Sequence, residues 1–278
     1  MNDLENSILV TYDFTEVAMD AVAHAAFFSK ALDTGITLLH IVKKDVEVSE
    51  MEEQLATEAE KVKEIYNILP SILVRKGTIF DTINEVSHEF KCMMVIMGTH
   101  GMKGLQKLTG SWALKVIVGS KVPFLVVQAP PSPSVDMKKV IFPVDFRTEN
   151  KEKLKWAQFM SKYFGSKMFL FSATSKDGVV ESRTKNNLVF SKAFLEEKNI
   201  NYELVLSPDT SSFSQEIIEY AENKNADLII ITTTRDIAFH DYILAAREQY
   251  IIANSAKIPV LVINPRTDLM KYGYGNFG

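Results

Sequence analysis

VIMGTHGMKGLQKLTGSWALKVIVGSKVPFLVVQ, residues Val95 to Gln128, is the stretch that decides the fold. It begins inside an apolar strand predicted over Met93–Met97, and a helix is expected from about Ser111. A second apolar strand, Val122–Gln128, closes the stretch. Between the first strand and the helix is a loop that contains four glycines, Gly98, Gly101, Gly104 and Gly110. Strand, loop, helix and strand in this order are typical of an α/β fold.

The glycine loop predicts a phosphate site. Glycine lets the backbone come close to a ligand, and the loop leads into a helix N-terminus, where free N–H groups and the helix dipole favour an anion. The loop is not a Walker A motif, because no Gly-Lys-Ser/Thr follows at the required spacing. It is not the dinucleotide fingerprint either, because its first two glycines are one residue too far apart. A surface loop with glycines for turning is the alternative.

An internal repeat fills most of the chain. The strand ending at Thr11-Tyr12-Asp13-Phe14 returns, 132 residues later, as the strand ending at Pro143-Val144-Asp145-Phe146. The strand Val122–Val127 returns as Ile258–Ile263. Strands and amphipathic helices alternate throughout both halves, which predicts two doubly wound five-stranded parallel sheets. We expect domains at 1–129 and 138–264, a proline-rich linker at 130–137 and a tail at 265–278.

The ligand site follows from the expected strand order, 3-2-1-4-5. Ligands of doubly wound sheets bind beyond the carboxyl ends of the strands, where the strand order reverses. The reversal would lie between the first and fourth strands, which end near Asp13 and Gly98. One site would then hold the acid and the glycine loop together. A capping role for Asp13 on the following helix is the alternative.

Composition narrows the class of protein. The chain has 278 residues, of which 46% are hydrophobic and 24% charged, as expected for a globular protein. The net charge of −4 gives no indication of a nucleic-acid or anionic-membrane partner. A single cysteine, Cys92, excludes a disulfide within the chain, and the N-terminus lacks the pattern of a signal peptide. We expect a cytoplasmic protein with no membrane span. The histidines show no metal-ligand spacing, so we expect no metal site made of side chains alone.

These residues together resemble the universal stress protein family. The likeness lies in the strand ending at Asp13-Phe14-Thr15, the loop Met97–Gly101, Gly110-Ser111 at the start of a helix, and the VPFLVV strand. It covers nearly all of residues 7–264 and is similar to the tandem two-domain form. The loop resembles the ATP-binding signature of the family, with a spacer of eight residues between Gly101 and Gly110 instead of nine.

The resemblance implies an adenine nucleotide alpha hydrolase-like fold that binds ATP with Mg²⁺. In this sequence Thr11, Asp13, Ile41 and Val42 would hold the adenosine. The residues implied around the ribose and the phosphates are Met97, Gly98, Gly101, Gly110, Ser111 and Trp112, and His100 lies in the same loop, in contact with a phosphate or exposed.

The second half lacks this loop chemistry. Thr232 and Arg235 stand where Gly98 and Gly101 would be, and Ala246-Arg247 stands in place of Gly110-Ser111. The two arginines and Thr232–Thr234 could hold an anion with their side chains, although a sheet retained for structure is the favoured interpretation. The resemblance also implies that Phe124–Val127 and Val260–Ile263 pair between the halves and make a pseudo-dimer within one chain. A homodimer of whole chains stays open.

Three functions remain. The first is a nucleotide-binding regulatory protein of the stress response, in which ATP orders the Gly98–Gly110 loop. The second is a slow ATPase or phosphotransferase, although no nucleophile–base–acid set supports an enzyme. The third is a scaffold or small-ligand module that no longer binds ATP. The sequence identifies no protein partner.

Overall fold

The computed structural model describes residues 4–99, 110–118, 120–147, 152–207, 212–233 and 242–264. The elements of the first half are β1 Ile8–Thr11, α1 Glu16–Leu32, β2 Ile36–Val42, the short 3-10 helix η1 Asp45–Glu47, α2 Val48–Tyr66, β3 Ser71–Lys76, α3 Ile79–Glu89, β4 Met94–Gly98, α4 Gly110–Ile117 and β5 Phe124–Val127. The elements of the second half are β6 Lys139–Val144, α5 Leu154–Phe164, β7 Lys167–Ala173, α6 Gly178–Glu197, β8 Tyr202–Ser207, α7 Phe213–Lys224, β9 Leu228–Thr232, α8 Tyr242–Ile252 and β10 Val260–Ile263.

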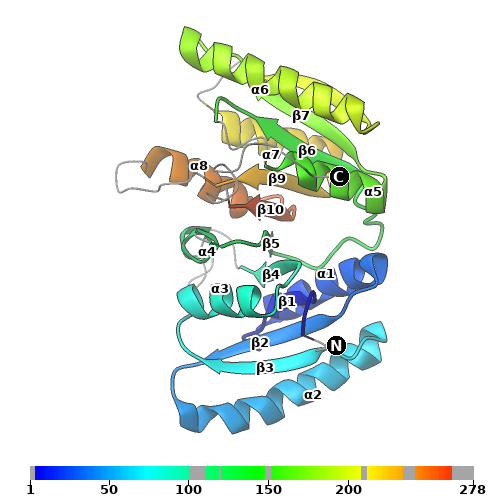
Figure 1. Ribbon diagram of the computed structural model, residues 1–278, viewed down its shortest axis with the longest axis vertical. Coiled ribbons are helices and arrows are strands. Elements are labelled where there is room, and N and C mark those ends of the chain that lie inside the picture. The colour runs from blue at the N-terminus through cyan, green and yellow to red at the C-terminus, as the bar shows by residue number, and fades with distance from the viewer. Residues whose placement is uncertain are drawn as a thin grey trace.

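All ten strands form one sheet, in the order β3-β2-β1-β4-β5-β10-β9-β6-β7-β8 (Figure 1). Within each half the strands are parallel, and the predicted order 3-2-1-4-5 is confirmed for the first half. The second half has the same order, read from β8 to β10. An α/β fold with parallel strands buried under helices therefore accounts for the alternating apolar pattern of the sequence.

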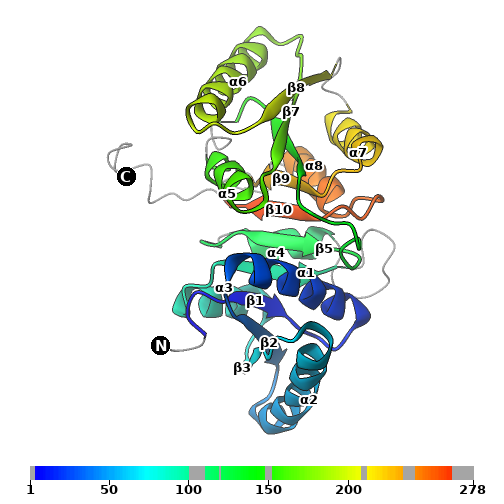
Figure 2. The same ribbon diagram turned by 90° about the vertical axis from the view of Figure 1, so that its right-hand side faces the viewer.

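The two halves meet in the middle of the sheet. Strands β5 and β10 pair antiparallel, with Leu125 opposite Leu261, so the predicted pairing of the last strands is confirmed (Figure 2). Because each strand covers the open edge of the other, neither edge is left unpaired at the centre of the molecule. The outer edges of the sheet are β3 and β8, and α2 and α6 lie at the two far ends (Figure 2).

Two hydrophobic cores lie on the two faces of this sheet. One core is built with residues of α1, α2, α5 and α6, and the other with residues of α3, α4, α7 and α8. Both cores run through both halves without a break. The halves are therefore joined by buried apolar surface as well as by the β5–β10 ladder.

Polar and aromatic contacts add to the join between the halves. The Gln128 side-chain nitrogen donates to the carbonyls of Ile252 and Asn254, each at 3.1 Å. On the other face, the rings of Phe27 in α1 and Phe164 in α5 are stacked with centroids 5.6 Å apart. These contacts fix the angle at which the halves meet.

Several helices end on a residue in the left-handed conformation. Gly165 ends α5 in this way. Gly35 and Pro70, residue types that often stop a helix, both lie past the ends of α1 and α2. Asp33 and Asn67 take the left-handed C-cap position instead. Asparagine and aspartate tolerate that conformation because their short side chains bond locally.

The segment between the halves is held against the core. Its last residue, Met137, is fully buried, and the carbonyl of Ala129 lies 3.1 Å from the Nε2 atom of His24 in α1. A semi-rigid spacer that only separates two domains would not bury a methionine. The C-terminal end of the predicted linker is thus packed into the core, and the Ser166 hydroxyl of the second half donates to the Met137 carbonyl. None of the described helices is long and apolar enough to cross a lipid bilayer.

Candidate functional site

The carboxyl ends of β1, β2 and β4 lie side by side in the first half. Strand β1 pairs with β2 on one side and with β4 on the other. The structure therefore brings together the strand ends that precede Asp13 and the glycine loop, as predicted. Helix α4 begins at Gly110, after the loop, and returns the chain to β5 beside β4.

Asp13 is exposed and one of its oxygens is already in use. Its Oδ1 accepts from the backbone N–H of Thr15 at 3.2 Å and from the Thr15 hydroxyl at 2.5 Å. Thr15 in turn is the N-cap of α1, since its hydroxyl accepts from the N–H of Ala18 at 3.3 Å. Asp13 thus supports the start of the helix through the N-cap Thr15, and Thr15 rather than Asp13 caps α1.

The residues on either side of Asp13, Tyr12 and Phe14, are held in place by contacts with β2 and α2. The carbonyl of Tyr12 lies 2.7 Å from His40 Nδ1, and the ring of Phe14 lies 4.8 Å from the His40 ring. Phe14 has φ of 64°, a left-handed conformation that is costly for a large side chain and marks a constrained position. The Tyr12 hydroxyl donates to Glu58 at 2.8 Å. Burial, with Glu58 beside it, raises the pKa of Tyr12 well above its ordinary value, so the hydroxyl stays a donor.

Gly98 has a packing reason to be glycine. A Cβ atom at this position would lie 2.4 Å from the carbonyl oxygen of Val17 in α1. The first turn of α1 therefore packs directly on the bare backbone at the end of β4. This packing contact is sufficient by itself to require glycine at position 98, without any contact with a ligand.

The remaining predicted residues have the following places. Thr11 is half-buried at the end of β1, and Ile41 and Val42 end β2. Met97 is 1% exposed and belongs to the core under α3 and α4, so only its backbone can face a ligand at the sheet edge. The first three residues of α4 are Gly110, Ser111 and Trp112, and the predictions for His100, Gly101 and the spacer fall outside the described residues.

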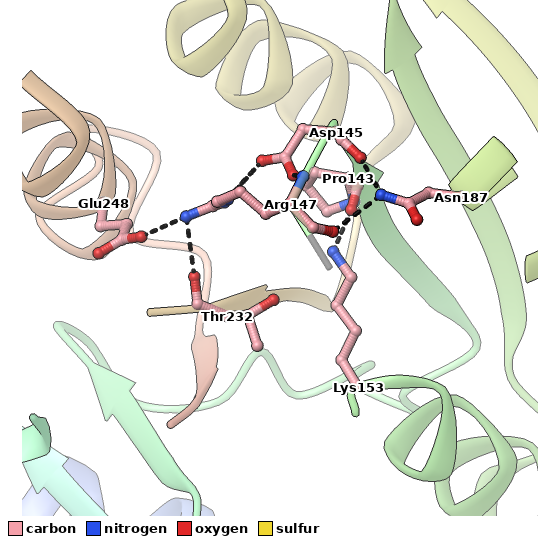
Figure 3. Close-up of polar contacts among 7 residues, drawn as sticks. All are labelled: Pro143, Asp145, Arg147, Lys153, Asn187, Thr232 and Glu248. Atoms are coloured by element: carbon pink, nitrogen blue, oxygen red, sulfur yellow. Dashed lines mark hydrogen bonds and ion pairs between the residues drawn. The ribbon is translucent and has the colours of Figure 1, made fainter. Parts of the chain in front are cut away.

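The second half carries a partly buried ionic cluster at the equivalent place (Figure 3). The guanidinium of Arg147 bonds the carboxylate of Asp145, with Nη2 at 2.7 Å, and its Nη1 lies 2.5 Å from Glu248 Oε1 in α8. Nη1 also donates to the carbonyl of Thr232, at the end of β9, at 3.4 Å. Arg147 therefore spans the edge of the sheet from β6 to α8 and β9.

Asn187 and Lys153 fix the backbone around this arginine (Figure 3). The Asn187 amide, from the sheet-facing side of α6, donates to the carbonyls of Asp145 and Arg147, each at 2.8 Å. Lys153 is 1% exposed, and its ammonium group donates to the carbonyl of Pro143. The loop that follows β6 is thus held from both sides.

The charged groups of this cluster shift one another's pKa values. Burial opposes the ionised form of Asp145, but the adjacent Arg147 outweighs it and holds the pKa of the carboxyl below its ordinary value. Burial lowers the pKa of Lys153 to about 7, against the opposing attraction of Asp145. Asp145 and Arg147 therefore stay charged at neutral pH, while Lys153 is divided between its two protonation states.

Two cavities flank the cluster. The smaller, about 30 Å³, includes Arg147, Lys153 and Glu248 in its wall. It has room for about one water molecule. The larger, about 220 Å³, lies between the ends of β6 and β7, α6, α7 and α8. Arg247, Asp145 and Phe213 line both.

Arg147 is the residue that the sequence comparison of the halves missed. At the offset of 132 residues it replaces the N-cap Thr15, and this exchange was the available signal. The helix also starts later: α1 begins at Glu16, whereas α5 begins at Leu154, which corresponds to Val22.

Comparisons with known proteins agree with this architecture. Residues 6–128 match the model of the universal stress protein family. A universal stress protein of Methanocaldococcus jannaschii is 27% identical in an alignment 146 residues long, which covers 46% of this chain and 85% of that protein. The crystal structure of a universal stress protein from Archaeoglobus fulgidus covers 94% of this chain and 99% of its own, with a TM-score of 0.75 and 19% identity.

Another structure is that of a universal stress protein from Archaeoglobus fulgidus in complex with dAMP. It covers 47% of this chain and 98% of its own, at 20% identity and a TM-score of 0.34, which is too low for a comparison of sites. The match of residues 6–128 identifies the N-terminal half, and the first structure shows the fold of the whole chain. Residues 6–128 therefore form a domain of the universal stress protein family, in a chain that has the fold of a solved universal stress protein.

Proposed function

We propose that the N-terminal half binds ATP with Mg²⁺ and that the chain acts as a regulatory protein of the stress response. The observation that supports the proposal is the pairing of β1 with β4, since these two strands precede Asp13 and the glycine loop in the chain. A helix N-terminus follows the loop at Gly110. This is the place where doubly wound sheets bind ligands, and a helix N-terminus favours phosphate.

In this proposal the residues divide the nucleotide between them. Asp13, with the backbone of Thr11 and of Ile41–Val42, holds the adenosine, and Met97 and Gly98 contribute backbone only, beside Gly101. The N–H groups of Gly110, Ser111 and Trp112 meet the outer phosphates. Bound Mg²⁺ would neutralise part of the phosphate charge, with phosphate oxygens and water as its ligands because the glycine loop contains no acidic residue.

The second half is expected to leave ATP unbound. The guanidinium of Arg147 and the side chain of Glu248 occupy the strand ends that the first half offers to a ligand. The remaining space of about 220 Å³ is below the range of about 300–1,000 Å³ that is usual for ligand pockets. We therefore expect one ATP per chain.

Calorimetric titration of the protein with Mg-ATP tests the proposal. Wild type should bind with a stoichiometry of one. Gly101→Arg, which introduces the residue found at the corresponding place in the second half, should weaken binding more than tenfold. Gly178→Arg adds the same charge where a new side chain meets nothing within 4 Å, so it should bind like wild type.

The other two functions are the alternative outcomes. No heat and no thermal shift with Mg-ATP would leave the scaffold or small-ligand module. Release of ADP above background, lost in Asp13→Ala or Ser111→Ala, would instead make the protein a slow ATPase. The cytoplasmic location predicted from the N-terminus and the single cysteine belongs to the same proposal.

A further inference from the structure

The outer strand of the second half, β8, has apolar side chains that are open to solvent. Leu204 is 38% exposed and Leu206 is 61% exposed. At the offset of 132 residues between the halves, Leu206 corresponds to Val74 of β3, which is only 6% exposed. The two outer edges of the sheet therefore differ, although the fold repeats.

The position of the covering helix explains this difference. Helix α2 packs on β2 and β3, whereas α6 packs mainly on β6 and β7. Asn187 of α6 donates to the carbonyls of Asp145 and Arg147, which holds the helix towards the middle of the sheet. Its C-terminal end still reaches the start of β8, since the Tyr202 hydroxyl donates to Glu196 at 2.5 Å. The two leucines further along the strand remain exposed.

The two outer strands also differ in charge. Strand β3 ends with Arg75 and Lys76, and charged side chains are a common protection of an edge strand. Strand β8 has one charged residue, Glu203, which forms ion pairs with Lys167 at 2.8 Å and Lys224 at 3.8 Å. It contains no lysine, arginine or proline. Strand β8 therefore lacks the usual features that keep an edge from pairing with another chain.

The backbone of β8 has donors and acceptors directed away from the sheet. The carbonyls of Asn201 and Ser207 accept backbone hydrogen bonds from the β7 side, at 2.9 and 3.3 Å. A parallel strand bonds to one neighbour through every second residue, so the odd-numbered residues of β8 face β7. The N–H and C=O groups of Tyr202, Leu204 and Leu206 therefore point outward, and no described strand pairs with them.

We propose that β8 pairs with the β8 strand of a second copy of this chain, antiparallel and centred on Leu204. In this register Leu204 lies opposite Leu204 of the second copy, and Tyr202 lies opposite Leu206 of the second copy. All three residues would exchange backbone hydrogen bonds across the interface, and their side chains would meet on one face. The ten-stranded sheet would then continue from one copy into the other.

The strand is complementary to itself, which makes a second copy the expected occupant. A two-fold axis through Leu204 gives each outward donor an acceptor and each exposed leucine an apolar neighbour. The other outer strand is a poor partner, because Arg75 and Lys76 would be brought against apolar side chains and lose hydration. Pairing of β8 with itself also closes at two copies, whereas β8 against β3 would continue into a fibre.

Analytical ultracentrifugation of the full-length, nucleotide-free protein tests the proposal. Wild type at micromolar concentration should have twice the chain mass of 31.3 kDa. Leu204→Lys places two ammonium groups opposite each other and should weaken the association at least tenfold. Leu206→Lys should weaken it as well, and its greater exposure keeps the test valid if Leu204→Lys fails to fold. Ile65→Lys is the matched control, because Ile65 of α2 is 63% exposed, and it should leave the dimer intact.

Cysteine cross-linking tests the register. Leu204→Cys brings two thiols to opposite positions of a hydrogen-bonded pair, with Cα atoms about 5.5 Å apart, which is within the range of a disulfide. Oxidised glutathione should therefore convert this variant into a covalent dimer. Leu206→Cys lies opposite Tyr202 instead of its own equivalent and should cross-link far less. The native Cys92 is 4% exposed and should stay reduced in both variants.

Three results would each overturn the proposal. A monomeric wild type at millimolar concentration would leave β8 to a strand of a different protein. A dimer that persists in both lysine variants would place the contact elsewhere on the chain. Equal cross-linking of Leu204→Cys and Leu206→Cys would exclude the register. The inference goes beyond the proposed function, and because no nucleotide is present, none of these results bears on ATP binding by the first half.

Discussion

Gly98 and Asp13, two residues of the proposed N-terminal site, also have structural contacts of their own. Gly98 belongs to the predicted phosphate loop, yet its missing side chain is what lets the Val17 carbonyl approach the end of β4. Asp13 is poised at the sheet edge, yet its Oδ1 holds the Thr15 N-cap of α1. A change at either residue therefore alters the start of α1 together with any ligand contact, and stability must be measured beside binding.

Gly98→Ala is expected to lower stability even without a ligand. The new Cβ would lie 2.4 Å from the Val17 carbonyl oxygen, and this neighbour is backbone that cannot move alone. Overpacking of this kind costs about 1–3 kcal/mol of the free energy of unfolding. Chemical denaturation monitored by circular dichroism would measure the loss.

Gly178→Ala is the matched control for that experiment. Its Cβ would meet nothing within 4 Å, and it lies in the first turn of α6. The stability should change by less than about 0.5 kcal/mol, as for most surface substitutions. Equal losses in the two variants would contradict the packing role of Gly98.

Helix α1 shows how one element ties distant parts of the chain together. It packs on β4, stacks Phe27 on Phe164 of α5, and holds the segment after β5 through His24. His24 is 1% exposed and, among the described residues, its Nδ1 has no hydrogen-bond partner. Burial lowers its pKa to about 4. The neutral ring of His24 is thus buried in the contact between α1 and Ala129, which follows β5.

The free energy of unfolding should fall as the pH drops from 6.5 to about 4. The unfolded chain takes up a proton at His24 near pH 6.5, whereas the folded protein resists until about pH 4. The contribution of His24 is therefore complete above pH 6.5 and is lost towards pH 4, by roughly 3 kcal/mol in all. Denaturant unfolding at a series of pH values from 7 to 4 would measure it.

Two variants separate His24 from the carboxylates, which titrate at the lower end of that range. His24→Gln should flatten the dependence between pH 7 and 5, whereas His88→Gln, at an exposed residue of α3, should preserve it. An unchanged pH profile in His24→Gln would show that the ring is not the group responsible.

At the scale of the whole molecule the two halves share one sheet and two continuous cores. The antiparallel pair β5–β10 lies at the centre of the ten strands. Gln128 reaches across it to α8, the helix that also carries Glu248 of the ionic cluster. Melting of one half would expose an edge strand and apolar surface of the other, which favours cooperative unfolding of the full chain.

Differential scanning calorimetry should therefore show a single transition, with equal calorimetric and van't Hoff enthalpies. Gln128→Ala removes hydrogen bonds to Ile252 and Asn254 and should lower that transition as a whole, at a cost of about 1–3 kcal/mol. Gln54→Ala, on the exposed face of α2, should leave it in place. Two separate transitions, with only one moved by Gln128→Ala, would show that the halves unfold independently.

The helices and strands could be predicted because apolar periodicity and the internal repeat can both be recognised in the sequence without knowledge of the fold. The strand order expected of a doubly wound sheet is confirmed, and so is the β5–β10 pairing, which the family resemblance implied. The Arg147 cluster was missed because Asn187 and Glu248 are far from Arg147 in the chain and reach it only in the fold. The packing of Gly98 was hidden for a similar reason, since a glycine in a loop gives no indication of what approaches it.

The position of β5 and β10 also has a consequence during synthesis on the ribosome. Strand β5 ends at Val127, but its partner begins only at Val260, about 130 residues later. At about 5–20 residues per second, roughly 7–26 s pass before the partner strand emerges. Throughout that interval the nascent chain displays an apolar strand with an unsatisfied edge. Two neighbouring nascent chains on one messenger RNA present the same unpaired edge to each other, which exposes this strand to pairing between chains before its own partner is made.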